Sequence, residues 1–287
     1  MTILHRNQSI GIVALSNGLN PTMSDKLKVL ERCLNSLQIP CVWPEKLFQE
    51  QSVFHATDQE RAKMLMTYYQ DEQIQAIFDI SGGDLANGVL TYLDYDVIRA
   101  NPKPFFGYSD LSVVLNAIYS QAGVPTYWYQ LRHLIGSHAS LQVKMFEETL
   151  LYGGQSLFEF EVEWIQGDQM QGEVVGGNIR CFLKLAGTPY MPDVKGKILL
   201  LESFSGDVAK MATYLNQYKQ QGVFNQIEGL MLGSFTEMEQ KGYQPDILTL
   251  VKQIVDVPTL PIVKTSQIGH GDDSRCVIIG EYLSLRR

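Results

Sequence analysis

The chain has 287 residues, 45% of them hydrophobic, and a formal net charge of −8 at pH 7. This length is typical of two domains with separate cores, and the negative charge argues against nucleic acid or an anionic membrane as a main partner. No apolar run near the N-terminus is long enough for a membrane span or a signal-peptide core, so we expect a cytoplasmic protein. The four scattered cysteines form no C-x-x-C pair, which predicts neither a zinc site nor a disulfide framework.

The first half of the sequence alternates strand-like and helix-like segments. Such alternation predicts a parallel sheet that helices cover on both faces. In chain order, the segments are a buried strand at Ile10–Leu15, a helix capped by Ser24 or Asp25, a helix near Asp58–Tyr69, a strand at Ala76–Ile80, short helical pieces at Leu85–Leu93 and Asp94–Ala100, an apolar run at Lys103–Phe106 and a helix at Leu111–Gln121.

The pattern changes after Tyr152, where a Gly-Gly loop is followed by a strand-like alternation of apolar residues from Phe158 to Trp164. We therefore expect an N-terminal α/β domain over residues 1–150, a linker over 151–165, and a C-terminal α/β domain with a mixed sheet over 166–287. The second domain's segments are a strand and turn at Gly172–Asn178, a helix capped by Asn178, a strand at Gly196–Glu202, a helix at Asp207–Gln220 stopped by Gly222, a strand at Gly229–Gly233, a helix at Asp246–Val255, and strands at Pro261–Val263 and Cys276–Ile279.

The most informative segment is Gly107-Tyr108-Ser109-Asp110, which lies between an apolar strand and an amphipathic helix. A serine on a strand-to-helix turn is lifted clear of the sheet, and the N–H groups of the helix N-terminus can hold a developing oxyanion. This favours a serine nucleophile. The same residues also suit a plain turn in which Ser109 or Asp110 caps the helix.

A serine nucleophile needs a base and an acceptor that orients the base. His270 is flanked by glycines, which leave its imidazole accessible, although a surface loop histidine has the same pattern. Glu202 ends an apolar strand, where open α/β sheets carry functional groups, although such a carboxylate can also cap a neighbouring element. Gly82-Gly83 follows another strand at the same edge and suits either an oxyanion loop or a tight turn.

Together these segments resemble the LD-carboxypeptidase family of serine peptidases, which includes self-immunity peptidases acting on microcin-type peptide-nucleotides. The resemblance runs from Ile10 to about Leu283 and rests on the order of the motifs: the Gly-Gly loop, Gly-Tyr-Ser-Asp, Gly176-Gly-Asn-Ile, Ala186-Gly-Thr-Pro-Tyr190, the strand ending in Glu202 and the Gly-His-Gly loop. It implies two α/β domains with the active site in the cleft between them.

The resemblance also implies residue roles. Ser109 would be the nucleophile, His270 the general base and then acid, and Glu202 the group that orients the imidazole. The backbone N–H groups of Asp110 and Gly83, rather than Gly82, would form the oxyanion hole. The family needs no metal or other cofactor, and its habit of dimerising makes a homodimer the expected assembly.

The substrate class is implied less closely, because the segment Tyr127–Arg132 departs from the family's usual sequence. The first expectation is a murein tetrapeptide, cut at the L,D-peptide bond before its terminal D-alanine. Arg132, Arg180 or Lys184 could bind the terminal carboxylate. The alternatives are a detoxifying peptidase for peptidyl- or aminoacyl-nucleotide antibiotics, with Trp128 or Tyr129 stacking on the base unless they belong to the core, and a non-catalytic protein that binds ligands in the cleft.

Overall fold

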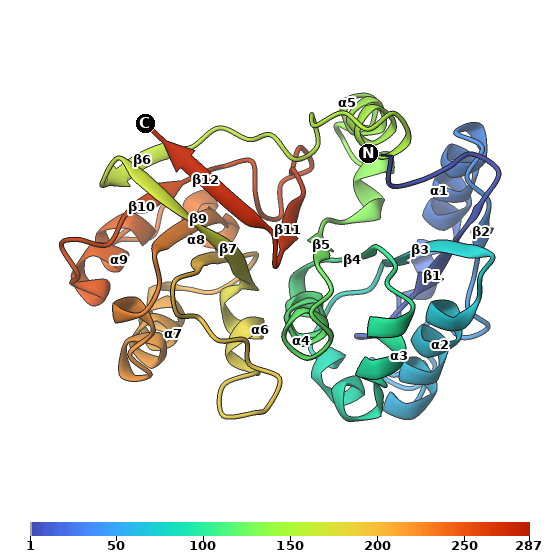
Figure 1. Ribbon diagram of the computed structural model, residues 1–287, viewed down its shortest axis with the longest axis horizontal. Helices are drawn as coiled ribbons and strands as arrows, with labels where there is room; N and C mark the ends of the chain where they lie inside the picture. Colours follow the sequence, from blue (N-terminus) through green and yellow to red (C-terminus); the bar gives the residue numbers. More distant parts are fainter. Residues whose placement is uncertain (1) are drawn as a thin grey trace.

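A computed structural model of the protein describes residues 2–287. It consists of two α/β units, each built on a six-stranded sheet, that lie side by side (Figure 1). The sequence prediction of two α/β domains, the first on a mostly parallel sheet and the second on a mixed one, is confirmed. Within residues 2–287, no helix is long and apolar enough to cross a bilayer.

The first sheet has the strand order β11-β5-β4-β3-β1-β2. All its pairs are parallel except the edge pair β11–β5. The central strands are buried along their length, as expected for a parallel sheet covered on both faces. The strands are β1 (Ser9–Val13), β2 (Cys41–Val42), β3 (Ile74–Asp79), β4 (Phe105–Gly107), β5 (Thr126–Trp128) and β11 (Val277–Ile279).

Strand β11 corrects one expectation from the sequence. The segment Cys276–Ile279 was assigned to the layer of the second domain, but it pairs with β5 in the first sheet, with Val277 opposite Trp128. Figure 1 shows β11 between the two units, next to β5. A three-residue apolar strand carries no information about its partner, and here it pairs with β5 at the edge of the first sheet.

The second sheet has the order β12-β7-β8-β9-β10-β6, with a parallel centre and an antiparallel strand at each edge. Strand β8 is buried at all six positions, as its unbroken apolar run predicts. Strand β6 is shorter than expected, because the alternation from Phe158 forms a strand only from Glu163. The strands are β6 (Glu163–Gln166), β7 (Gln169–Asn178), β8 (Ile198–Ser203), β9 (Gly229–Phe235), β10 (Ile262–Lys264) and β12 (Tyr282–Arg286).

Helices cover both faces of the first sheet: α2, α3 and α4 pack on one face, and α1 and α5 on the other (Figure 1). The α-helices are α1 (Ser24–Ser36), α2 (Asp58–Gln70), α3 (Tyr95–Ala100), α4 (Ser112–Ala122), α5 (Ala139–Phe146), α6 (Ile179–Leu183), α7 (Val208–Gln220), α8 (Thr236–Lys241) and α9 (Ile247–Val255). The 3-10 helices are η1 (Pro21–Met23), η2 (Ala86–Tyr92), η3 (Ser109–Leu111), η4 (Leu131–Ile135) and η6 (Val223–Asn225), and η5 (Glu147–Leu151) is a short π-helix.

Of two helix caps predicted from the local sequence, one is confirmed and one is wrong. Asn178 caps α6, as expected, by accepting a hydrogen bond from the Cys181 N–H at 3.2 Å. The expected cap at Ser24 or Asp25 is wrong, because α1 continues directly from η1, whose own cap is Asn20. Ser24 is therefore already inside a helical turn, where its side chain has no end to cap.

The two units are joined through α4, whose apolar face belongs to a single core that continues into the second sheet. The buried Asn116 of α4 accepts a hydrogen bond from the Gly176 N–H (2.9 Å) and donates one to the Gly176 carbonyl (2.7 Å). Because α4 follows Ser109 through the η3 turn, this packing places the Ser109 turn near β7, the neighbour of the strand β8 that carries Glu202.

Candidate active site

Ser109 lies at the carboxyl end of β4, on a turn with an unusual backbone. Its φ is +57°, in the left-handed region that non-glycine residues rarely adopt. Such a conformation costs on the order of 1–3 kcal/mol and persists only where the surrounding structure enforces it. Here the turn is enforced by η3, in which the Leu111 N–H bonds the Tyr108 carbonyl at 3.0 Å.

The alternative interpretation of this turn, a simple helix cap, is not what the structure shows. Neither η3 nor α4 has a side-chain hydrogen bond at its N-cap. The Asp110 carboxylate instead bonds groups on other segments, and the Ser109 side chain lines a cavity. A strained serine that caps nothing and faces a cavity is the arrangement expected of a displayed nucleophile.

His270 and Glu202 meet across the second unit. The imidazole Nδ1 lies 2.7 Å from Glu202 Oε2, and the Glu202 side chain is fully buried at the end of β8. The imidazole packs between the rings of Tyr108 and Phe204, with centroid separations of 4.3 and 4.9 Å. Gly269, next to His270, has a φ of +141°, and a Cβ there would collide with Ser234. The glycine therefore permits the turn that seats the histidine.

Asn178, which the sequence analysis identified only as a helix cap, also contributes to the candidate site. Its Nδ2 donates to Glu202 Oε1 at 3.0 Å, so both carboxylate oxygens are occupied. Its backbone N–H donates to Ser112 Oγ at 2.9 Å, and Ser112 Oγ donates to the Ser109 carbonyl at 2.7 Å. Hydrogen bonds therefore connect the Glu202–His270 pair to the Ser109 turn across the boundary between the two units.

Ser109 and His270 line one cavity of about 380 Å³. Tyr108 and Phe204 supply apolar surface there, and Arg132 supplies a cation. Within residues 2–287 no hydrogen bond joins the Ser109 hydroxyl to His270. In ligand-free enzymes, hydrogen bonds between catalytic residues are often long, and they shorten only when the substrate is bound.

The Ser81–Asp84 loop lies at the same edge of the first sheet and is anchored by Asp79. One carboxylate oxygen of Asp79 accepts from the Ser81 N–H (2.7 Å) and hydroxyl (2.6 Å), and the other accepts from the Leu15 N–H (2.7 Å). Burial raises the pKa of Asp79 to about 6, against the lowering effect of these hydrogen bonds. Gly83 has a φ of +127°, and a Cβ there would collide with Asn17. Only glycine fits this position.

The aromatic residues expected to contact a substrate belong to the core instead. Trp128 and Tyr129 are 0% and 1% exposed, and neither lines the cavity. Trp128 Nε1 bonds Ser112 Oγ at 3.3 Å, and the Tyr129 hydroxyl bonds Gln142 at 2.9 Å. Trp128 ends β5, which lies inside the sheet because β11 covers its outer edge, and Tyr129 follows directly, with its N–H bonded to the Gly107 carbonyl at 2.8 Å. Stacking of these two rings on a ligand is therefore corrected to a packing role.

The three cations considered for a substrate carboxylate differ in their surroundings. Lys184 bonds Asp110 at 2.5 Å, and Arg180 pairs with Asp84. Arg132 forms no ion pair within residues 2–287, lines the cavity, and has a buried Nε without a hydrogen-bond partner. Burial lowers the pKa of Arg132. An incompletely solvated guanidinium without a partner is well suited to bind an anion.

Two neighbours of Arg132 were missed by the sequence analysis. Gln130 Nε2 and His133 Nε2 are also buried without hydrogen-bond partners among residues 2–287, and both residues line the cavity. The available signal was their position, since polar residues directly after a buried strand meet at the functional edge of an α/β sheet. In the described part of the chain, no group of three or more His, Cys, Asp and Glu residues is arranged to hold a metal ion.

The buried imidazole of His133 leads us to predict a loss of folding stability at acid pH. Burial lowers its pKa from 6.5 to about 4, so between these values the unfolded chain binds a proton that the folded chain does not. As far as His133 is concerned, the free energy of unfolding is therefore highest above pH 6.5, and it decreases by up to about 3 kcal/mol as the pH falls toward 4. Urea unfolding of wild type and His133→Gln at pH 7, 5.5 and 4 should show a shallower loss in the variant. Other titrating groups, including Asp79, affect both proteins equally. If the unfolding free energies of the two proteins fell in parallel with pH, the assignment of this loss to His133 would be contradicted.

Two known proteins are similar to this chain over most of its length. The murein tetrapeptide carboxypeptidase of Pseudomonas aeruginosa is 24% identical over 76% of this chain and 75% of its own length. The microcin self-immunity protein MccF of Escherichia coli is 23% identical over 80% of this chain and 76% of its own.

Two solved structures share the fold. MccF in complex with aspartyl sulfamoyl adenosine has a TM-score of 0.88 at 20% identity, covering 99% of this chain and 95% of that one. The muramoyltetrapeptide carboxypeptidase of Oxalobacter formigenes has a TM-score of 0.81 at 22% identity, covering 97% of this chain and 95% of the other.

Two family models also match this chain. Residues 10–129 match the LD-carboxypeptidase N-terminal domain, and residues 171–285 match the LD-carboxypeptidase C-terminal domain. Both matches occur in the order of the family and together span most of the sequence. The chain therefore belongs to the LD-carboxypeptidase family of serine peptidases, and it is a hydrolase.

Proposed function

We propose that this hydrolase is a serine carboxypeptidase that cleaves the L,D-peptide bond before the terminal D-alanine of murein tetrapeptides. The observation that carries the proposal is the hydrogen bond between His270 and the buried Glu202, on the same cavity as the strained Ser109. The supporting likeness is to relatives named as murein tetrapeptide carboxypeptidases.

In the proposed mechanism, Glu202 fixes the tautomer of His270. A carboxylate oxygen faces Nδ1, so Nδ1 carries the proton and Nε2 is free to act as a base. Nε2 accepts the Ser109 proton as Oγ attacks the carbonyl carbon, and the resulting imidazolium then protonates the leaving D-alanine amine. Water hydrolyses the acyl-enzyme with His270 again as base, which releases the tripeptide and regenerates Ser109.

The negative charge that develops on the carbonyl oxygen needs donors in place. We assign this role to the backbone N–H groups of Asp110 and Gly83, which belong to the Ser109 turn and to the loop that Asp79 anchors. Fixed backbone donors at such a position stabilise the transition state more than the ground state.

Arg132 is assigned to the terminal carboxylate of the substrate. Replacement by methionine keeps most of the side-chain volume and removes the charge, so we expect KM to rise by about 30–100-fold with kcat less affected, as for loss of a charge-assisted hydrogen-bond pair. Steady-state kinetics should compare the free tetrapeptide with its C-terminal amide. Wild type should prefer the acid, and Arg132→Met should not.

Lys26 provides the matched control for Arg132, because it lines the same cavity but is exposed to solvent. A hydrated lysine contributes little to pairing, so Lys26→Met should raise KM by no more than about 3-fold. Equal effects of the two substitutions would argue against the assignment to Arg132.

The first experiment on the proposed function is incubation of the purified protein with a disaccharide-free murein tetrapeptide, followed by mass spectrometry. We expect loss of one alanine, and no loss from the diastereomer that ends in L-alanine. Cleavage of both diastereomers, or of neither, would reject this substrate assignment.

A second candidate is a peptidase that cleaves peptidyl- or aminoacyl-nucleotide antibiotics, favoured by the likeness to MccF. Phe204 offers one feature that suits it: its ring is 56% exposed and lines the cavity, so a base could stack on it. Hydrolysis of an aminoacyl sulfamoyl adenosine, measured beside the tetrapeptide at equal concentration, decides between the two substrates by the ratio of kcat/KM values.

A further inference from the structure

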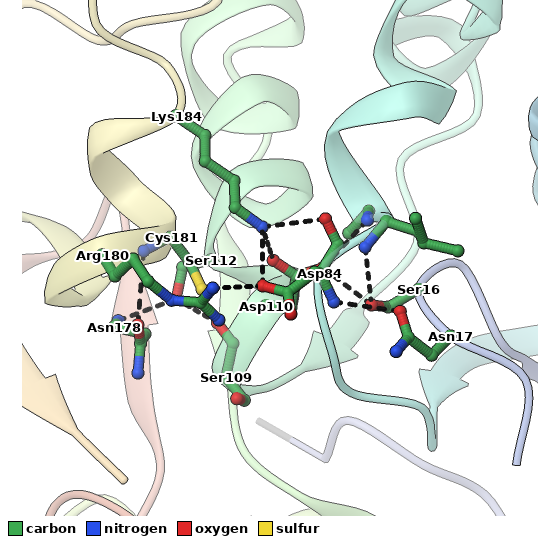
Figure 2. Close-up of polar contacts among 12 residues, drawn as sticks. Ser16, Asn17, Asp84, Ser109, Asp110, Ser112, Asn178, Arg180, Cys181 and Lys184 are labelled. Atoms are coloured by element: carbon green, nitrogen blue, oxygen red, sulfur yellow. Dashed lines mark hydrogen bonds and ion pairs between the residues drawn. The ribbon is translucent and has the colours of Figure 1, made fainter. Parts of the chain in front are cut away.

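A buried polar cluster lies next to Ser109 and outside the cavity lining. Asp110 directly follows Ser109, and its carboxylate is fully buried. It accepts hydrogen bonds from the Ser16 hydroxyl (2.7 Å), the Ala86 N–H (2.9 Å) and the Lys184 ammonium (2.5 Å) (Figure 2). A buried carboxylate is stable only while such donors remain, so its position is tightly determined.

Lys184 reaches this cluster from the other unit of the protein. It is the C-cap residue of α6, and its ammonium also donates to the backbone carbonyl of Asp84 at 2.9 Å. Arg180, one turn earlier on α6, pairs with the Asp84 carboxylate, and Figure 2 shows both side chains pointing toward the Asp84–Asp110 pair. The end of one helix thus holds two separate segments of the first unit.

The loop held in this way is the one that contains Gly83. It is tied from a third side, because the Asp84 N–H donates to Asn17 Oδ1 at 3.0 Å and the Leu85 N–H donates to Ser16 Oγ at 3.3 Å. Ser16 in turn donates to Asp110. The two backbone segments assigned to the oxyanion therefore share one set of contacts. Within residues 2–287, Lys184 is the only cationic residue of this cluster that contacts both segments.

We infer that Lys184 is a positioning residue of the active site: its ammonium, bonded to the Asp110 carboxylate and the Asp84 carbonyl, holds the backbone N–H groups of Asp110 and Gly83 in place for the oxyanion. The inference rests on the proposed function, which assigns those N–H groups. It replaces the expectation that Lys184 binds a substrate carboxylate, since the ammonium already has two acceptors and does not line the cavity.

Lys184→Met tests the inference because it keeps the length of the side chain and removes the donor. We expect kcat to fall by about 10–100-fold with KM within about 2-fold, because misplaced oxyanion donors weaken only the transition state. Lys197→Met is the matched control. Lys197 is also largely buried and also joins the two units, through Glu173 and Tyr119, but it is not part of the cluster. Its removal should leave kcat within about 2-fold.

A second readout does not depend on the identity of the substrate. An alkyl fluorophosphonate transfers its phosphonyl group to an activated serine hydroxyl, with loss of fluoride and the hydroxyl proton. The phosphonylated Ser109 is detected as a mass increase. Wild type and Lys197→Met should be labelled at similar rates, and Lys184→Met about 10-fold or more slowly.

The outcomes separate the two claims. Labelling of wild type without tetrapeptide cleavage would reject the substrate and leave the role of Lys184 to be judged by the labelling rates. Equal labelling and equal kcat in wild type and Lys184→Met would overturn the inference, as would a raised KM at unchanged kcat. A wild type that is neither labelled nor active would overturn both claims.

Folding is monitored by thermal unfolding of each variant. If Lys184→Met does not fold, Lys184→Arg carries the test, because it keeps the positive charge but replaces the ammonium by a larger planar group. We then expect a kcat several-fold below that of wild type with unchanged KM, and wild-type kcat would overturn the inference.

Discussion

Ser109→Ala is expected to lower kcat on the order of 10⁵-fold, because it removes the atom that forms the acyl-enzyme. The fold should be unaffected. Ser109 Oγ makes no hydrogen bond to another side chain within residues 2–287, and alanine adopts the same left-handed backbone at a similar cost. We expect a change in unfolding free energy within about 1 kcal/mol. Release of alanine from the tetrapeptide, followed over hours, measures the residual rate.

Ser120→Ala is the matched control for this substitution. Ser120 lies on α4, the helix that follows the Ser109 turn, and its hydroxyl bonds the Tyr190 carbonyl at 2.8 Å, away from the cavity. Its loss should leave kcat within about 2-fold. Ser109→Ala retaining more than about 1% of wild-type kcat would exclude Ser109 as the nucleophile.

Glu202→Gln is expected to have the second largest effect, about 10⁴-fold on kcat, through the tautomer of His270. Asn178 Nδ2 donates to Oε1, so a glutamine at this position would place its oxygen toward Asn178 and its NH₂ group toward His270 Nδ1. An imidazole that accepts at Nδ1 carries its proton on Nε2. It can then no longer accept the Ser109 proton, although the shape of the site is preserved.

Glu173→Gln is the control for loss of a glutamate charge, since Glu173 pairs with Lys197 at a distance from the cavity. The two variants should have similar unfolding curves and differ in kcat. Steady-state kinetics of both, with circular dichroism to confirm folding, test the assignment. A Glu202→Gln enzyme within about 10-fold of wild type would show that Glu202 does not set the tautomer.

Much of the fold could be predicted from the sequence because the relevant signals are local. The unbroken apolar run at Ile198–Leu201 predicts a strand buried on both faces, and the pattern from Asp58 predicts the helix that is observed. Ser109 and Glu202 could be named for the same reason, since both stand at the carboxyl ends of apolar strands. Periodicity and strand ends can be read from neighbouring residues alone.

The partners of these elements could not be read in this way. β11 has three residues, and its sequence does not distinguish the edge of β5 from the second sheet. Likewise Trp128 and Arg132 stand four residues apart in one segment, yet one is fully buried and the other lines the cavity. Whether each side chain is buried or lines the cavity depends on which strand covers β5 and on where η4 leaves the sheet.

The sequence by itself predicted the two α/β units, a strand-to-helix turn at Ser109, and Glu202 and His270 as the candidate acidic and basic groups. Only the tertiary structure decided how the charges are shared: Glu202 with His270 and Asn178, Lys184 with Asp110 and Asp84, and Arg132 with no ion-pair partner within residues 2–287. The physical reason is distance along the chain. Long charged side chains choose partners by the three-dimensional packing of their elements and by the cost of leaving a buried charge unpaired, and neither is encoded in local sequence.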